Sequence, residues 1–161
     1  MSEILQHLED NLRRQVALYD ELNTLESHKQ KSIINSKLQE LEAITLREEQ
    51  LLLEASHLEK ERLLWAEQIG RDLGQAPEEL TLAELAKHYP MLQGVRFELD
   101  RTVNALQAIH EINAELLKQA MKVVEFTVSM LTHQDKRTYN HPTNHKEDEV
   151  KPKLHLLDRR V

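Results

Sequence analysis

Few side chains in this sequence have the types and spacing that support catalysis. Glu54 and His57 form a Glu-x-x-His pair, the spacing that places two metal ligands on one helical face in di-iron bundles. Such a site needs a second Glu-x-x-His pair and further inward carboxylates, and the sequence has no second pair. We therefore interpret Glu54 and His57 as solvated residues of a helix.

Histidines near the C-terminus offer a second arrangement. His141 and His145 are four residues apart, and His133 and His155 flank them. Zinc binding is conceivable with such a set, but Pro142 keeps His141 out of helical conformation. The spacing also fixes no third ligand. We expect no metal site here.

A group of carboxylates, Glu48, Glu49 and Glu54, with His57 beside them, resembles the acidic helices of all-α nucleotide pyrophosphohydrolases. No later Glu-x-x-Asp completes a magnesium site, and the chain has no glycine-rich phosphate loop. We expect no enzyme activity and no cofactor, and we keep a metal-dependent hydrolase only as the third hypothesis.

Glycine and proline are scarce and unevenly placed. The 161 residues contain three glycines, four prolines and no cysteine, and neither glycine nor proline occurs before Gly70. Sandwiches, barrels and Rossmann-type folds need glycines in their turns and phosphate loops. The sequence therefore predicts an all-α fold without disulfides.

Charge and hydropathy limit the possible partners. The net charge of −7 leaves no clustered basic face, so we expect no nucleic acid partner. Charges such as Lys122 and Glu125 interrupt the apolar stretches, so we expect no membrane insertion. The N-terminus lacks the basic and then apolar pattern of a secretory signal, which predicts a cytoplasmic protein.

Long helices must carry these residues. Apolar residues recur at intervals of three and four through the first part of the chain, which predicts a coiled-coil-like helix over 3–69, about 100 Å long. The polar interval 26–32 is a possible bend, although it has no glycine or proline. The stripe consists of Leu5, Leu8, Leu12, Val16, Tyr19, Leu22, Leu25, Leu41, Ile44, Leu51, Ala55, Leu58, Trp65 and Ile69.

A connector over 70–94 follows and contains all the glycines. Thr81 and Glu84 have the spacing of a capping box, which predicts a short helix over 82–88. A second long helix is predicted over 92–133. The two long helices would form an antiparallel hairpin in a helical domain of residues 1–134, and residues 135–161 would form a flexible tail.

The last helix has a wide apolar surface. Its second half carries two apolar rows where one partner helix needs only one, which indicates a second partner. The helices are also unequal in length, so a fold-back of the first helix at 26–32, a homo-oligomer or a client protein must cover the excess. His110 and Asn113 lie between the apolar positions, and Asn113 suits a core position that fixes register.

Several stretches together resemble the FlgN-type flagellar export chaperones. The resemblance covers nearly the whole chain, and Asn113-x-x-Leu116-Leu117-x-x-Ala120 is its most distinctive part. The long first helix, residues 80–85 (LTLAEL), residues 109–120 (IHEINAELLKQA) and residues 138–140 (TYN) contribute to it. His141 and Pro142 follow Tyr139 where this family often has a glycine shortly after the tyrosine.

The resemblance implies a cytoplasmic chaperone of the flagellar type III export system. Its clients would be the hook-filament junction proteins FlgK and FlgL, held by their C-terminal amphipathic helices until they reach the export apparatus. The residues expected to contact the client or shape its groove, and in the tail to dock on the apparatus, are Ile109, Asn113, Leu116, Leu117, Ala120, Met121, Val124 and Tyr139. The main alternative is a self-associating structural coiled coil, and the free protein is expected to be a monomer or a homodimer.

Overall fold

The computed structural model describes residues 2–133, and these are helical nearly throughout. Its long helices are α1 (Ser2–Ile34), α2 (Leu38–Leu73) and α4 (Gln93–His133). A short helix, α3 (Leu82–His88), and two 3-10 turns, Pro77–Glu79 and Pro90–Leu92, join α2 to α4. No strand occurs among these residues, so the all-α prediction is confirmed.

The helix predicted over 3–69 is two helices, and the chain reverses at residues 35–37. Ser36 adopts the left-handed conformation with φ 54°, and Lys37 N–H donates to the carbonyl of Ser32 at 2.9 Å. Ser36 N–H donates to the carbonyl of Ile33 at 3.3 Å, which completes a Schellman motif. The expected bend at 26–32 lies inside α1, and the reversal comes a few residues later, without glycine or proline.

The connector follows its prediction closely. Thr81 caps α3, because its hydroxyl accepts a hydrogen bond from Glu84 N–H at 3.1 Å. The short helix predicted over 82–88 is therefore confirmed with its predicted cap. The last long helix begins at Gln93, one residue after the predicted start. Its N-terminus follows a 3-10 turn that starts at Pro90, where a proline at the first position is well tolerated.

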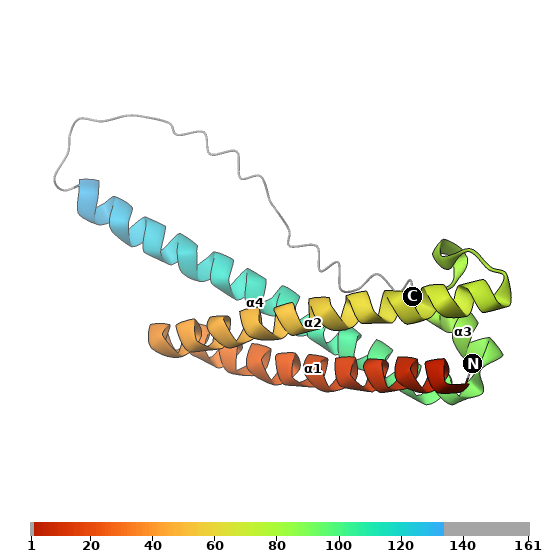
Figure 1. The fold of residues 1–161 in the computed structure, drawn as a ribbon. Coiled ribbons are helices and arrows are strands. Elements are labelled where there is room, and N and C mark those ends of the chain that lie inside the picture. The colour runs from red at the N-terminus through yellow and green to blue at the C-terminus, as the bar shows by residue number, and fades with distance from the viewer. Residues whose placement is uncertain (1, 134–161) are drawn as a thin grey trace.

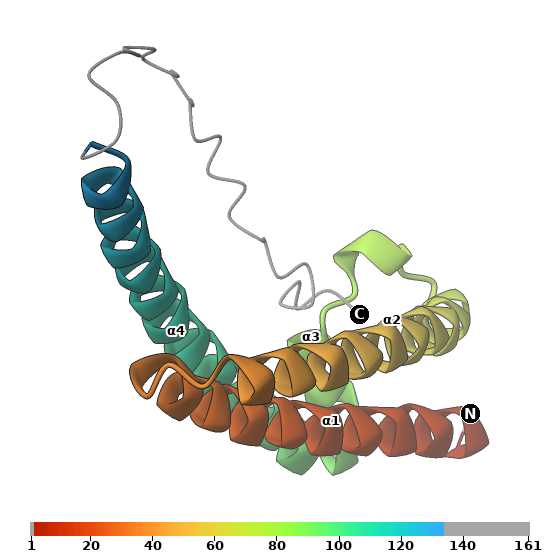
Figure 2. The ribbon, with the colours of Figure 1, turned by 90° about the vertical axis from the view of Figure 1, so that its left-hand side faces the viewer.

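Helix α1 lies in the middle of the arrangement and packs against both α2 and α4 (Figures 1 and 2). It runs antiparallel to α2 and parallel to α4 (Figure 1). The apolar stripe predicted for the first helix forms the core, with Leu8 and Leu12 fully buried between the neighbouring helices. Side chains of α2, α3 and α4, such as Leu51, Leu85 and Leu99, complete one hydrophobic cluster.

The end of α4 leaves this core. Both views show α4 diverging from the hairpin of α1 and α2 near the turn at 35–37 (Figures 1 and 2). Asn113 is the last buried residue of α4, and every residue from 118 to 133 is exposed. No helix within residues 2–133 is both long and apolar enough to cross a membrane.

Candidate functional site on the last helix

The residues predicted to form the site fall on both sides of the point where α4 leaves the core. Ile109, Leu116 and Leu117 are half-buried, and Asn113 is only 1% exposed. Ala120, Met121 and Val124 are exposed; Met121 and Val124 each expose 61%. Tyr139 lies outside the described residues. The predicted set therefore runs from residues packed at the edge of the core to residues that are exposed.

Asn113 joins α4 to α1. Its side-chain amide donates to the carbonyl of Glu26 at 2.7 Å and to Glu26 Oε2 at 2.6 Å. Both bonds are buried, and a buried bond to a charged acceptor is stronger than one between neutral groups. This geometry suits the register-fixing role that the core position of Asn113 suggests, and it leaves the side chain no surface to offer a partner.

Glu26 belongs to a polar cluster that we call the three-helix junction, made of three buried residues, Glu26, Glu48 and Asn113, and two half-buried ones, Lys29 and His110. Glu26 and Lys29 come from α1, Glu48 from α2, and His110 and Asn113 from α4. Lys29 Nζ lies 3.1 Å from Glu48 Oε2 and 3.7 Å from Glu26 Oε1. His110 Nδ1 lies 3.7 Å from Glu26 Oε1.

The two carboxyl groups of the junction differ in acidity. Burial, and then the hydrogen bond and like charge of Glu26, raise the pKa of Glu48 to about 7, although Lys29 opposes this. Burial also disfavours the charge of Glu26, but the hydrogen bonds from Asn113 and Glu48 and the charge of Lys29 lower its pKa overall. Glu48 Oε1 is buried and has no hydrogen-bond partner among the described residues. A protonated Glu48 can donate a hydrogen bond to Glu26, whose ionised form accepts it.

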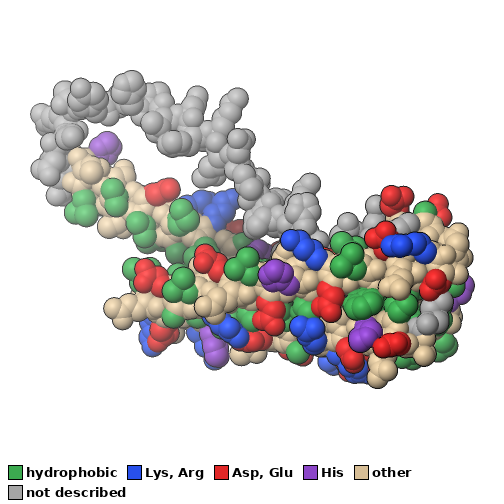
Figure 3. All heavy atoms as spheres, in the orientation of Figure 1, with side chains coloured by type: hydrophobic (Ala, Val, Ile, Leu, Met, Phe, Trp, Pro, Cys, Tyr) green, Lys and Arg blue, Asp and Glu red, His purple; other side chains and the backbone are tan. Residues whose placement is uncertain are grey.

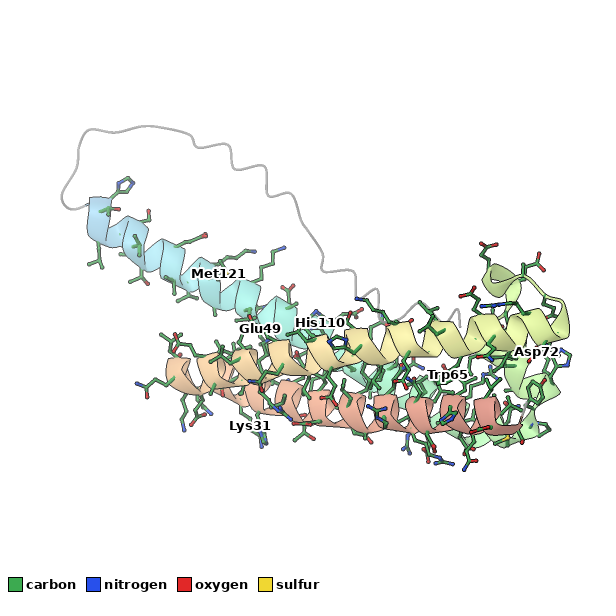
Figure 4. The ribbon with its side chains drawn as sticks, in the orientation of Figure 1. Lys31, Glu49, Trp65, Asp72, His110 and Met121 are labelled. Atoms are coloured by element: carbon green, nitrogen blue, oxygen red, sulfur yellow. The ribbon has the colours of Figure 1, made fainter. Side chains whose placement is uncertain are left out.

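From the junction to its C-terminus, α4 carries exposed hydrophobic side chains that we call the apolar end of α4. Eight large apolar side chains on it are each more than half exposed, and hydrophobic side chains are visible along it in Figure 3. Met121 lies on the part of the helix that extends away from the hairpin (Figure 4). Large exposed apolar patches are typical of interaction sites. The eight are Ile112, Met121, Val123, Val124, Phe126, Val128, Met130 and Leu131.

The hairpin turn adds apolar side chains that the sequence analysis did not assign to the site. Ile34 and Leu38 flank the turn and are about two-thirds exposed. They lie at the end of the hairpin from which α4 diverges (Figure 2). Sequence reasoning missed them because it treated this stretch as the middle of one helix. The available signal was the pair of adjacent isoleucines, Ile33 and Ile34, just before two small polar residues, Asn35 and Ser36.

The family comparison decides what kind of protein this is. A family model described as "FlgN protein" matches residues 1–147, which is most of the chain. The chain belongs to the FlgN family. This confirms the resemblance stated from the sequence, and FlgN proteins are flagellar export chaperones in general. Neither the search of curated proteins nor the search of solved structures gave a match.

The structure of this FlgN protein also separates the residues considered for metal chemistry. Glu48 is buried in the three-helix junction, whereas Glu49, Glu54 and His57 are exposed on α2. Successive helical residues are rotated by about 100°, so Glu54 and His57 share one face of α2 while Glu48 and Glu49 point in other directions. Among residues 2–133, no three histidine, aspartate or glutamate side chains form a group that could hold a metal ion.

Proposed function

We propose that this FlgN protein is a cytoplasmic chaperone that binds the C-terminal amphipathic helices of the junction proteins FlgK and FlgL on the apolar end of α4. Eight large apolar side chains, exposed along α4 from Ile112 to Leu131, are the observation that supports the proposal. Burying such a side chain stabilises a complex by about 1.5–3 kcal/mol before the costs of association. The client would remain unassembled until the complex reaches the export apparatus.

The dimensions of this surface suit one helix as the occupant. From Ile112 to Leu131 the apolar side chains cover about 30 Å of α4, the length of a helix of about 20 residues. An amphipathic helix in an apolar groove is a common mode of peptide recognition. Met121 and Met130 are flexible and unbranched, so the surface can adapt to two related clients.

The remaining predicted residues have distinct roles in this proposal. Ala120, Met121 and Val124 contact the client directly, because they are exposed on the free part of α4. Ile109, Leu116 and Leu117 continue this surface toward the core, and Asn113 shapes it by holding the helix root on α1. Tyr139, which lies outside the described residues, is proposed to dock on the export apparatus.

Replacing Val124 with Asp tests the surface. Light scattering after size exclusion should show a one-to-one complex between the wild-type chain and a C-terminal fragment of FlgK or FlgL. The Val124→Asp variant should keep its helicity and lose most of this binding, because a charge would be buried in the interface. Ser129→Asp is the matched control, since it adds the same charge to the same exposed part of α4. Ser129 is five residues after Val124, so its side chain points about 140° away from that of Val124 around the helix axis.

Self-association is the alternative for the same surface. A stable homodimer that Val124→Asp dissociates, and that binds neither fragment, would contradict the chaperone proposal. Equal binding by Val124→Asp and the wild type would show instead that the client binds elsewhere. Loss of helicity in Val124→Asp would show that this face is part of the folded core, which would also contradict it.

A further inference from the structure

The three-helix junction lies where the packed part of α4 ends. Asn113 and His110 belong to α4, and the helix has no buried residue after Asn113 within the described chain. Local opening needs least free energy where few apolar contacts must be broken. A change in the junction would therefore first affect the segment of α4 around residues 110–113, which we call the root of α4. The hairpin of α1 and α2 would be affected less, because it retains Leu51, Leu58 and the rest of its core.

With a neutral His110, the charges within the junction balance when one of the two carboxyl groups holds a proton. Two carboxylates, Glu26 and Glu48, share the single ammonium group of Lys29 at 3.7 and 3.1 Å. His110 of α4 is a further ionisable group of the junction, and its Nδ1 lies 3.7 Å from Glu26 Oε1. Without the proton, the junction buries an additional negative charge, which is strongly unfavourable unless water enters or the helices separate.

The acceptor that holds α4 is one member of this pair. Both hydrogen bonds of Asn113 end on Glu26, one on its carboxylate and one on its carbonyl. Repulsion from an ionised Glu48, and competition for Lys29, act directly on that carboxylate. The ionisation of a residue on α2 is thereby linked to the attachment of α4 to α1.

We propose that Glu26 and Glu48 form a proton-controlled clamp on the root of α4. With one proton shared between them, α1, α2 and α4 are held together and the apolar end of α4 has a fixed direction. When the proton is lost, the root loosens and that direction varies. The consequence for client binding rests on the proposed function: a fixed helix loses less freedom on binding, so the clamped state binds the client helix more tightly.

Distance measurements between two spin labels test the clamp itself. The chain has no cysteine, so Glu42→Cys on α2 and Lys122→Cys on α4, both at exposed positions, give one unique label pair. Between about pH 6 and pH 8 the ratio of protonated to ionised Glu48 changes about 100-fold. We expect one narrow distance distribution at the lower pH and a broader one at the higher pH.

Matched variants identify the titrating group. Glu48→Gln should keep the narrow distribution at both pH values, because its amide can donate to Glu26 as a protonated Glu48 would. Glu49→Gln removes the same charge from the exposed neighbouring position and should leave the pH dependence intact. His110→Gln should also leave it intact. If Glu48→Gln unfolds, Glu26→Gln supplies the test, since it also removes the paired charge.

The outcomes separate the clamp from the proposed function. The clamp would be overturned if the wild type gave the same distance distribution at both pH values. It would also be overturned if the distribution of Glu48→Gln still changed with pH, or if the change with pH disappeared only in His110→Gln. The FlgK or FlgL fragment is titrated separately at both pH values. At about pH 8 the wild type should bind it less tightly than Glu48→Gln does. A clamp that responds to pH in a protein that binds no fragment would refute the proposed function alone.

Discussion

At the residue scale, the molecule places its most unusual chemistry in the core and not on the surface. Glu26 is 5% exposed and Glu48 is 9% exposed, and both are carboxyl groups, which are rarely buried unless paired. Lys29 and Asn113 supply the pairing from two different helices. The contact between α1 and α4 therefore depends on a few polar side chains as well as on apolar packing.

The pH dependence of stability follows from Glu48. Its pKa is about 7 in the folded protein, above its usual value of 4.5, so the folded state binds the proton more tightly than the unfolded state does. The free energy of unfolding should therefore fall as the pH rises from about 4.5 to 7, by at most about 3 kcal/mol. Glu26 acts in the opposite sense: its lowered pKa costs stability as the pH falls below about 4.5.

Urea unfolding followed by the fluorescence of Trp65, the single tryptophan, measures this dependence. Glu48→Gln should flatten the curve between about pH 5 and pH 8 and should be more stable than the wild type at the upper end. Parallel curves for the two proteins would show that Glu48 does not carry the effect.

Asn113→Ala should destabilise the fold. The change removes both hydrogen bonds to Glu26 and leaves its buried carboxylate and carbonyl without these donors. The expected loss is about 2 kcal/mol in the free energy of unfolding, measured by chemical denaturation. Gln107→Ala, at an exposed position of the same helix, should change stability by less than about 0.5 kcal/mol. Similar losses in both variants would indicate a general effect on α4.

At the element scale, the end of each hairpin helix is set by one left-handed residue. Ser36 ends α1 with φ 54°, and Gly74 ends α2 with φ 67°. Both ends are Schellman motifs: Lys37 N–H donates to the carbonyl of Ser32, and Gln75 N–H donates to that of Gly70. The same backbone geometry is therefore made by a serine in one place and a glycine in the other.

These two ends give opposite predictions. Ser36→Gly should stabilise the protein by about 0.5–1 kcal/mol, because glycine adopts the left-handed conformation without steric penalty. Gly74→Ala should destabilise it by about 1 kcal/mol for the reverse reason. No atom lies within 4 Å of an added Cβ at Gly74, so the effect would come from the backbone alone. Thermal unfolding followed by circular dichroism measures both, and equal shifts in one direction would contradict this account.

The same elements show how far sequence reasoning reaches. The apolar stripe of α1 and the Thr81 cap of α3 are local patterns, and both were predictable. The reversal at 35–37 was not, because Ser36 carries no compositional sign of a left-handed residue and the apolar stripe continues on both sides. The pairing of Glu26 with Glu48 depends on that reversal, which brings together residues about ten positions either side of it. The exposed surface of α4 was predicted as a widened apolar face. Only the three-dimensional structure shows that Asn113 is buried against α1 while the apolar residues that follow it are exposed.

At the scale of the whole molecule, the packed bundle and the free end of α4 are separable. Every residue from 120 to 133 is exposed. The free energy of unfolding of a chain that ends after Gln119 should therefore lie within about 1 kcal/mol of that of a chain that ends after His133. Only the longer chain should bind the FlgK or FlgL fragment. Calorimetric titration of the fragment and urea unfolding of both chains measure this, and a large loss of stability in the shorter chain would show that the free end supports the bundle.

The central position of α1 also determines the order in which the chain can fold. Its contacts with α2 join residues such as Lys29 and Glu48, 19 positions apart, whereas its contacts with α4 join Asn23 and Thr102, 79 apart, and Glu26 and Asn113, 87 apart. Contacts between distant residues form more slowly because a longer loop must close. During synthesis the hairpin of α1 and α2 can form once residue 73 has emerged, while the side of α1 that receives α4 stays open. We therefore expect α4 to dock last, onto a hairpin that is already complete.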